Sequence, residues 1–277
     1  MIQTVFIATM LTVGAMGAEG QVAHMDRAAA ATQLRQALTH YETAVAMKTS
    51  TPEESRRLFT EAANGFRSLV EAGYGSAGLH YNLANALVRL GRLGPAIVNY
   101  RRALRLEPGN ERIQRNLDFA RSRCQTPIPP PALSQFATTV FSWHYHTAFS
   151  SRLTLAVAGY VVFWLLLIVG RSLRYRAAWL AWVKWPIALL SLVLLTSVAV
   201  DSYRRTHVTE GVLTADNVTL RKGYGENYDP QLDRPLSEGV EVLIRETRRD
   251  VENREWFYVE LPDGKSGWLR ADQCSII

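Results

Sequence analysis

The chain has 277 residues and a formal net charge of +6, and 48% of its residues are hydrophobic. The apolar residues gather in two dense blocks near the middle of the sequence, which favours a membrane protein over a single soluble domain. The arginines are dispersed and form no long basic tract, so the charge does not indicate nucleic-acid binding. Cys124 and Cys274 are too few for a disulfide framework or a zinc site, and whether they form one long-range disulfide stays open.

The chain begins with an apolar segment followed by small residues. Val5–Val13 is the apolar part, and Ala15 and Gly17 stand at a spacing suited to cleavage by signal peptidase. No Lys or Arg precedes the apolar part, which departs from the usual pattern of signal peptides. We therefore expect residues 1–18 to be either a signal peptide or an uncleaved N-terminal anchor.

Residues 77–108, AGLHYNLANALVRLGRLGPAIVNYRRALRLEP, fit the tetratricopeptide (TPR) pattern of paired helices. Small side chains at Ala84 and Ala96 would let the two helices pack closely, and Tyr100 would fill the gap to the next repeat. Pro108 would end the second helix. The pattern predicts an all-α domain of TPR hairpins over residues 25–123.

The flanking segments extend this helical domain. One repeat length earlier, Ala62, Phe66 and Leu69 occupy the small and apolar positions, which predicts a degenerate repeat. Residues 51–54, TPEE, are typical of a capping box with a proline in the first helical position. Asn110 is expected to cap a further helix that closes the array.

A stack of such helices presents a concave surface on which partner peptides can bind. The candidate peptide-binding residues there are Tyr81, Asn85, Val88 and Arg89. An alternative with equal weight is that these are ordinary surface residues, because a groove formed by so few repeats is shallow.

Residues 124–150 link the helical domain to the first apolar block. The stretch QTPIPPPALSQ is rich in proline and is expected to act as a stiff spacer. His144 and His146 could supply half of a metal site, but no further ligands stand near them, so no metal is predicted. The aromatic residues near the end of this segment are expected to lie at the membrane interface: Phe141, Trp143, Tyr145 and Phe149.

The two apolar blocks are long enough to span a membrane. Residues 153–170 are uncharged, and residues 179–200 are interrupted only by Lys184, near one end. The intervening loop, residues 171–178, contains three arginines and no acid, so the positive-inside rule places it in the cytoplasm. Both large flanking regions would then lie outside the cytoplasm. The arginines that determine this topology are Arg171, Arg174 and Arg176.

After Glu210 the apolar residues alternate with the period of β-strands. Val218 and Leu220 predict one strand of a set of five, and Pro262–Gly264 predicts a tight hairpin. The charged stretch RETRRDVENRE is expected to be a solvated loop. We expect residues 210–277 to form a small all-β barrel.

The segments GVLTADNVTLRKGYGENYDP, LSEGVEVLIRE and EWFYVELPDGKSGWLRADQCSII resemble the bacterial SH3-like (SH3b) domain. Because members of that family bind cell-wall peptides or other proteins, the resemblance implies an interaction module in the cell envelope. Tyr224 and Tyr228 are the candidate ligand contacts. Trp256 is a further candidate contact, but packing of Trp256 and Trp268 in the core or in a hairpin is favoured.

The order of parts resembles the BatE-type proteins of the bacterial aerotolerance operon. The segment EAGYGSAGLHYNLANALVRLGRLGPAIVNYRRALRLEPGN carries the strongest similarity. The resemblance implies, as partners, Bat membrane proteins with von Willebrand factor A domains and a MoxR-type ATPase that acts from the cytoplasm. The predicted fold class is a multidomain membrane protein with TPR hairpins, two transmembrane helices and a small SH3-like barrel.

The sequence contains no nucleophile elbow, phosphate loop, zinc-ligand spacing or catalytic carboxylate pair beside a histidine. We therefore expect no enzyme and no cofactor. The first hypothesis is an adaptor in the bacterial inner membrane that assembles an envelope protein complex through its TPR surface. The second is an envelope sensor or anchor that binds peptidoglycan or cell-wall peptides through the SH3b domain. Both place the TPR and SH3b domains on the periplasmic side.

Overall fold

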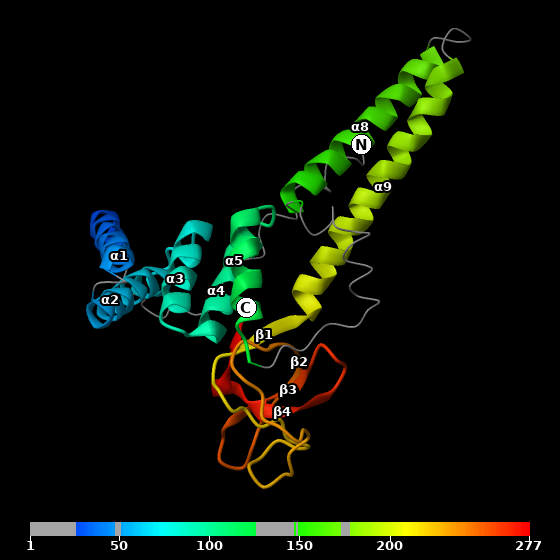
Figure 1. The fold of residues 1–277 in the computed structure, drawn as a ribbon. Coiled ribbons are helices and arrows are strands. Elements are labelled where there is room, and N and C mark those ends of the chain that lie inside the picture. Colours follow the sequence, from blue (N-terminus) through cyan, green and yellow to red (C-terminus); the bar gives the residue numbers. More distant parts are fainter. Residues whose placement is uncertain (1–25, 48–50, 126–146, 148, 173–177) are drawn as a thin grey trace.

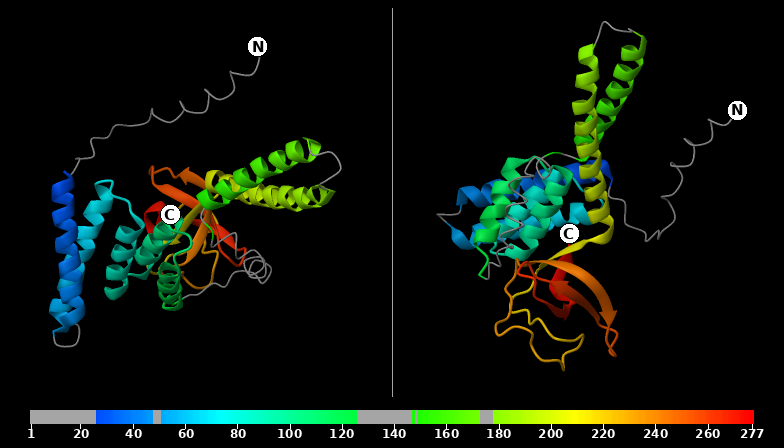
Figure 2. Two further views of the ribbon diagram at one scale, coloured as in Figure 1. Left: turned by 90° about the horizontal axis from the view of Figure 1, so that it is seen from above. Right: turned by 90° about the vertical axis from the view of Figure 1, so that its right-hand side faces the viewer.

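The computed structural model describes residues 26–47, 51–125, 147, 149–172 and 178–277. These form a region of consecutive helices, a long helical hairpin and a sheet (Figure 1). Both views of Figure 2 show the hairpin projecting away from the other two parts. The helices of the first region are α1 (Arg27–Met47), α2 (Pro52–Glu71), α3 (Ala77–Arg89), α4 (Leu93–Leu106) and α5 (Glu111–Ser122).

The core of the helical region consists largely of small and medium-sized apolar side chains. Ala84 and Ala96 are fully buried, which allows the close packing of α3 against α4. In α2, the predicted small and apolar positions Ala62, Phe66 and Leu69 are also buried. The helical periodicity read from the sequence is therefore confirmed on both sides of the α2–α3 turn.

Of the two helix caps predicted from the sequence, the cap of α5 is confirmed and the capping box of α2 is not. Asn110 caps α5 as predicted, since its Oδ1 accepts hydrogen bonds from the amides of Arg112 and Ile113. The capping box predicted at residues 51–54 is wrong, because the Thr51 side chain makes no capping hydrogen bond. The carboxylate of Glu54, which should return to the cap, is instead bound by the guanidinium of Arg57 in the next turn.

Helices α8 (Phe149–Ser172) and α9 (Ala178–His207) pack against each other as the hairpin. Phe149–Gly170 and Trp182–Tyr203 have mean hydropathies of 2.4 and 2.0 and are long enough to cross a membrane. Only 6% and 11% of these windows is buried, so the helices are not enclosed in a globular core. They are two candidate membrane-spanning helices.

An ion pair between a buried arginine and a partly exposed aspartate joins the two helices at one end of the hairpin. The guanidinium of Arg152, near the start of α8, forms an ion pair with the carboxylate of Asp201 and donates to the hydroxyl of Ser197. Further along the hairpin, Gly159 allows close approach, because a Cβ there would lie 2.2 Å from the Ser191 Oγ. Charge pairing and small residues therefore hold α8 and α9 together.

The C-terminal region is a five-stranded antiparallel sheet with strand order β4-β3-β2-β1-β5. This is an open order, and closure into a barrel is not shown. The predicted strand at Val218 and Leu220 is wrong, since Val218 forms only an isolated bridge with Leu236. The strands are β1 (Thr209–Leu213), β2 (Glu241–Arg249), β3 (Glu255–Glu260), β4 (Ser266–Arg270) and β5 (Cys274–Ile276).

The charged stretch RETRRDVENRE is more ordered than the sequence indicated. Its first five residues, Arg245–Arg249, belong to strand β2, and only residues 250–254 form the turn to β3. Asp250 organises this turn by accepting from the backbone amides of Glu252 and Arg254 and from the indole Nε1 of Trp256. The prediction that Trp256 and Trp268 pack inside is confirmed, because both are buried.

The sheet docks directly against α4 and α5. Val212 of β1 is fully buried and belongs to the same apolar core as Ile97 of α4. Gly94, in the first turn of α4, sits so close to the sheet that a Cβ there would lie 2.3 Å from the carbonyl oxygen of Leu213. The sequence did not reveal this contact, which joins segments more than 100 residues apart.

Three glutamates of the C-terminal region hold this contact electrostatically. Glu238 accepts from the backbone amides of Leu93 and Gly94 and thereby caps the N-terminus of α4. Glu210 pairs with Arg101 and Arg105, both of α4. Glu241 pairs with Arg101 as well and also with Arg121 of α5. Since the helical region and the sheet touch, they lie on the same side of any membrane that α8 and α9 cross.

Candidate functional site

Tyr81 and Asn85, two of the predicted peptide-binding residues, take part in a hydrogen-bonded network between helices. The hydroxyl of Tyr100 donates to Asn85 Oδ1 over 2.6 Å, and Asn116 Nδ2 of α5 donates to both Asn85 Oδ1 and the Tyr81 hydroxyl. Burial raises the pKa of Tyr100, so its hydroxyl keeps the proton that it donates. Both predicted residues are half-buried and join α3 to α4 and α5.

The other two predicted residues, Val88 and Arg89, line a cavity of about 460 Å³. It lies where the start of α2, the end of α3, the α3–α4 turn and the end of α5 meet. The lining residues are Pro52, Ser55, Arg56, Phe59, Val88, Arg89, Gly91, Leu93, Phe119 and Arg123. The four predicted residues therefore divide into a structural pair and a cavity-lining pair.

The cavity combines positive charge with an apolar lining. Arg56 and Arg89 belong to α2 and α3, Arg123 is the C-cap of α5, and no acidic residue is among the described residues that line the cavity. The guanidinium of Arg123 lies over the Phe119 ring, 5.1 Å from its centroid, and Phe119 is 49% exposed. Arg123 follows Arg89 by one repeat length, which is the sequence signal that could have placed it at the same cavity.

The sheet carries the second candidate site, an aromatic cluster defined by Tyr224, Tyr228, Tyr258 and Trp268. The centroid of Tyr224 lies 6.5 Å from that of Tyr228 and 5.3 Å from that of Trp268, which in turn lies 5.2 Å from Tyr258. Arg248 lies over both Tyr224 and Trp268. Tyr224 and Tyr228 are 36% and 50% exposed, so the two predicted contacts form one accessible surface.

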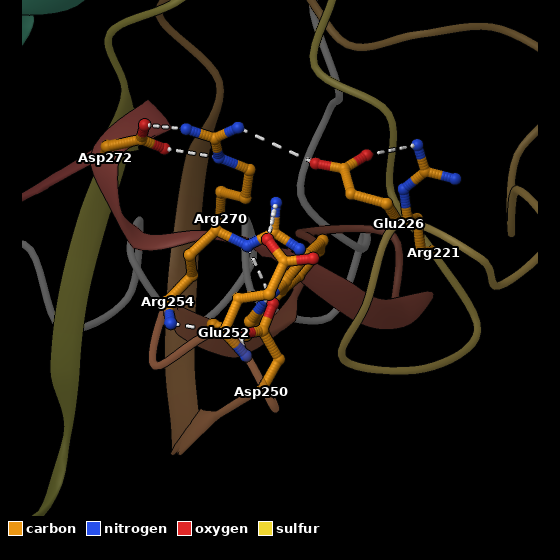
Figure 3. Close-up of polar contacts among 8 residues, drawn as sticks. Arg221, Glu226, Asp250, Glu252, Arg254, Arg270 and Asp272 are labelled. Atoms are coloured by element: carbon orange, nitrogen blue, oxygen red, sulfur yellow. Dashed lines mark hydrogen bonds and ion pairs between the residues drawn. The ribbon is translucent and has the colours of Figure 1, made fainter.

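Ion pairs fix the loop that carries these two tyrosines (Figure 3). Arg221 donates to the backbone carbonyl of Tyr228 and pairs with Glu226. The other carboxylate oxygen of Glu226 faces Arg270, which also pairs with Asp272. The loop geometry therefore depends on charges anchored in strand β4 and in the turn that follows it.

Comparison with known proteins gives one finding. Residues 77–110 match the family model of the tetratricopeptide repeat, which covers α3 and α4. The chain thus contains a tetratricopeptide repeat. It combines this repeat with two long apolar helices and a C-terminal antiparallel sheet. No curated protein and no solved structure matches the chain.

The matched TPR repeat contains only part of the cavity. Val88 and Arg89 lie within it, whereas Arg56 precedes it and Arg123 follows it. Arginines from α2, α3 and the C-cap of α5 can meet at one cavity because neighbouring helices of a repeat array stack side by side. The cavity is thus a feature of the stacked array rather than of one repeat.

Of the three predicted topology determinants, the structure describes only the backbone of Arg171. Arg171 lies in the last turn of α8, while Arg174 and Arg176 lie outside the described residues. The same holds for residues 1–18 and for most of the spacer, residues 126–146. Signal peptide, spacer and membrane orientation therefore stay predictions.

Proposed function

We propose that the protein is a non-enzymatic adaptor in the bacterial inner membrane that assembles an envelope protein complex through its TPR surface. The observation that carries this proposal is the open cavity beside Val88 and Arg89, on a repeat whose general use is protein binding. The two candidate membrane-spanning helices supply the membrane attachment.

The proposed orientation places the TPR region and the sheet in the periplasm. The basic loop with Arg171, Arg174 and Arg176 favours a cytoplasmic position for the turn between α8 and α9. The contact of the sheet with α4 and α5 supports a common location for the two flanking regions.

The resemblance to BatE-type proteins supplies the proposed partners. These are Bat membrane proteins with von Willebrand factor A domains, while a MoxR-type ATPase would act from the cytoplasm. Within the same proposal the C-terminal sheet is an SH3b module. Its paired, exposed Tyr224 and Tyr228 support a role in binding rather than in packing alone.

Photocrosslinking in native membranes tests the adaptor role. A photoreactive amino acid in place of Val88 should form covalent adducts with a specific protein, because its side chain lines the cavity. The matched control is Arg115 of α5, which is exposed but does not line the cavity. Absence of adducts at Val88, or the same adducts from Arg115, would overturn the proposal.

A second candidate function is binding of peptidoglycan or cell-wall peptides, and the aromatic cluster favours it. Flat rings beside Arg248 offer stacking and hydrogen bonding to a sugar or peptide ligand. Sedimentation of the full-length protein with purified cell wall should fall in Tyr224→Ala and Tyr228→Ala but not in Val251→Ala, a fully exposed position on a neighbouring hairpin. Equal sedimentation of all three variants would exclude this site.

Removal of the whole sheet is a poor test of either function. Its loss would uncover the apolar surface around Ile97 and leave Arg101 and Arg121 without their glutamates. Point variants avoid this effect because they leave the docked sheet in place.

A further inference from the structure

In the described part of the chain, the arginines of the cavity pair with no carboxylate, whereas five others of the helical region do: Arg57, Arg101, Arg105, Arg115 and Arg121. Arg57, one residue after Arg56, pairs with both Glu54 and Glu61. Arg101 pairs with glutamates of the C-terminal region. Among the residues that the structure describes, no carboxylate pairs with the guanidinium of Arg56, Arg89 or Arg123. Three cations around one cavity thus retain their capacity to bind an anion.

The cavity also has an apolar part that a simple anion would not use. Phe59 is 3% exposed and forms its floor, Val88 is half-buried, and Phe119 is left half-exposed on one side. A buried Ser55 hydroxyl beside the floor already donates to the carbonyl of Ala44 and needs no ligand. A ligand that fills this space therefore carries both apolar and negatively charged groups.

We propose that this cavity binds an acidic peptide segment, with an apolar side chain against Phe59, Val88 and Phe119. Carboxylates of the segment pair with the three arginines, whose planar guanidinium groups can each donate two parallel hydrogen bonds. The inference rests on the proposed adaptor function and names the chemistry of its partner.

A peptide fits these observations better than a nucleic acid does. A cavity of about 460 Å³ accommodates a few side chains, and no long basic tract in the sequence extends it into a groove for a phosphate backbone. The apolar side chains of the cavity floor offer a phosphate no hydrogen bond or charge. A nucleic acid nevertheless serves as an informative competitor in the test.

The test uses the detergent-solubilised full-length protein and fluorescence anisotropy. The probe is a labelled decapeptide of Asp and Glu with one central Phe, and its counterpart has Asn and Gln in place of the acids. We expect the acidic probe to bind and its affinity to fall about tenfold in Arg89→Gln and in Arg123→Gln. Arg115→Gln, on the outer side of α5 and paired with Glu111, should leave the affinity unchanged.

Three results would overturn the inference. The first is equal affinity for the acidic probe and its amide counterpart. The second is an equal fall in affinity for the acidic probe in Arg115→Gln. The third is that a labelled single-stranded oligonucleotide binds and that its binding is lost in Arg89→Gln and Arg123→Gln. Failure of the adaptor proposal is recognised separately. If Val88 still crosslinks to a protein that excess acidic peptide does not displace, only the acidic specificity is wrong, whereas absence of crosslinks refutes the adaptor role itself.

Discussion

Gly94 and Gly78 provide a matched test of the contact between the TPR region and the sheet. Each is the second residue of its helix, Gly94 in α4 and Gly78 in α3. A Cβ on Gly94 would lie 2.3 Å from the Leu213 carbonyl oxygen and 3.0 Å from the Thr214 Cα, which are backbone atoms that cannot rotate away. A Cβ on Gly78 would meet no atom within 4 Å.

The two alanine variants should therefore change stability in opposite directions. Replacement of a helical glycine by alanine stabilises by up to about 1 kcal/mol where space permits, and Gly78→Ala should gain this amount. Gly94→Ala has the same intrinsic gain, but overpacking against the sheet costs about 1–3 kcal/mol. The free energy of sheet docking should thus be lower in Gly94→Ala than in Gly78→Ala by about 1–3 kcal/mol.

Alkylation of Cys124 measures this docking. Its Sγ lies against Gly239 of the docked C-terminal region, where a Cβ would approach it to 2.3 Å. A docking free energy lower by about 1–3 kcal/mol corresponds to a roughly 5- to 150-fold larger population of molecules with the sheet undocked in Gly94→Ala than in Gly78→Ala. Cys124 should therefore be alkylated faster by a maleimide in Gly94→Ala. Cys274, buried in the core of the sheet itself, is the internal control. Equal alkylation rates of Cys124 in the two variants would refute the contact.

Four further predictions follow from single groups. Glu238→Gln should weaken the cap of α4 by about 0.5–2 kcal/mol and raise the Cys124 alkylation rate, measured as above. Burial raises the pKa of the Cys124 thiol to about 11. Because the thiolate is the reactive form, the alkylation rate of Cys124 should still increase with pH above about pH 9. A rate that reaches a plateau near pH 9 would contradict this prediction. Despite the opposing effect of desolvation, hydrogen bonds from its neighbours hold the pKa of Asp250 at about 2, below its usual 3.8. The stabilisation that the Asp250 carboxylate provides is therefore complete above about pH 4 and is lost as pH falls towards 2. Asp250→Asn should lack this acid dependence in a fluorescence-monitored unfolding series, and an unchanged dependence would contradict the prediction. Asp201→Leu alone should destabilise the hairpin by about 3–5 kcal/mol, because it leaves Arg152 buried beside an apolar side chain. Adding Arg152→Leu in the same chain should restore the stability of the hairpin, measured as protease resistance in membranes. A double variant no more resistant than Asp201→Leu would contradict this prediction.

The features that the sequence predicted correctly are those set by local patterns. The repeat period placed Ala62, Phe66 and Leu69 in the core, because small and apolar residues at helical spacing must face the same way. A short polar side chain before a helix predicted the Asn110 cap for the same local reason. Periodicity alone also predicted a strand at Val218, which the structure replaces by an isolated bridge.

The candidate sites were predicted only in part because they depend on distant contacts. Val88 and Arg89 were placed on the binding surface, but Arg56 reaches the same cavity through the packing of α2 against α3. Similarly, nothing near Glu238 in the sequence indicates that its carboxylate caps a helix 144 residues earlier. Tyr224 and Tyr228 were predicted together because they share one short loop.

The claim that both binding surfaces face the periplasm determines which partners can reach them, and cysteine labelling tests it most directly. Val251 is fully exposed at a hairpin turn of the sheet, so Val251→Cys is open to a membrane-impermeant maleimide. In intact spheroplasts, and with Cys124 and Cys274 replaced by serine, the proposal predicts labelling of Val251→Cys and none of Arg174→Cys in the loop between the candidate spans. Because the sheet touches α4, this one position reports on the TPR region as well. Labelling of Arg174→Cys but not of Val251→Cys would place both surfaces in the cytoplasm and contradict the proposed function.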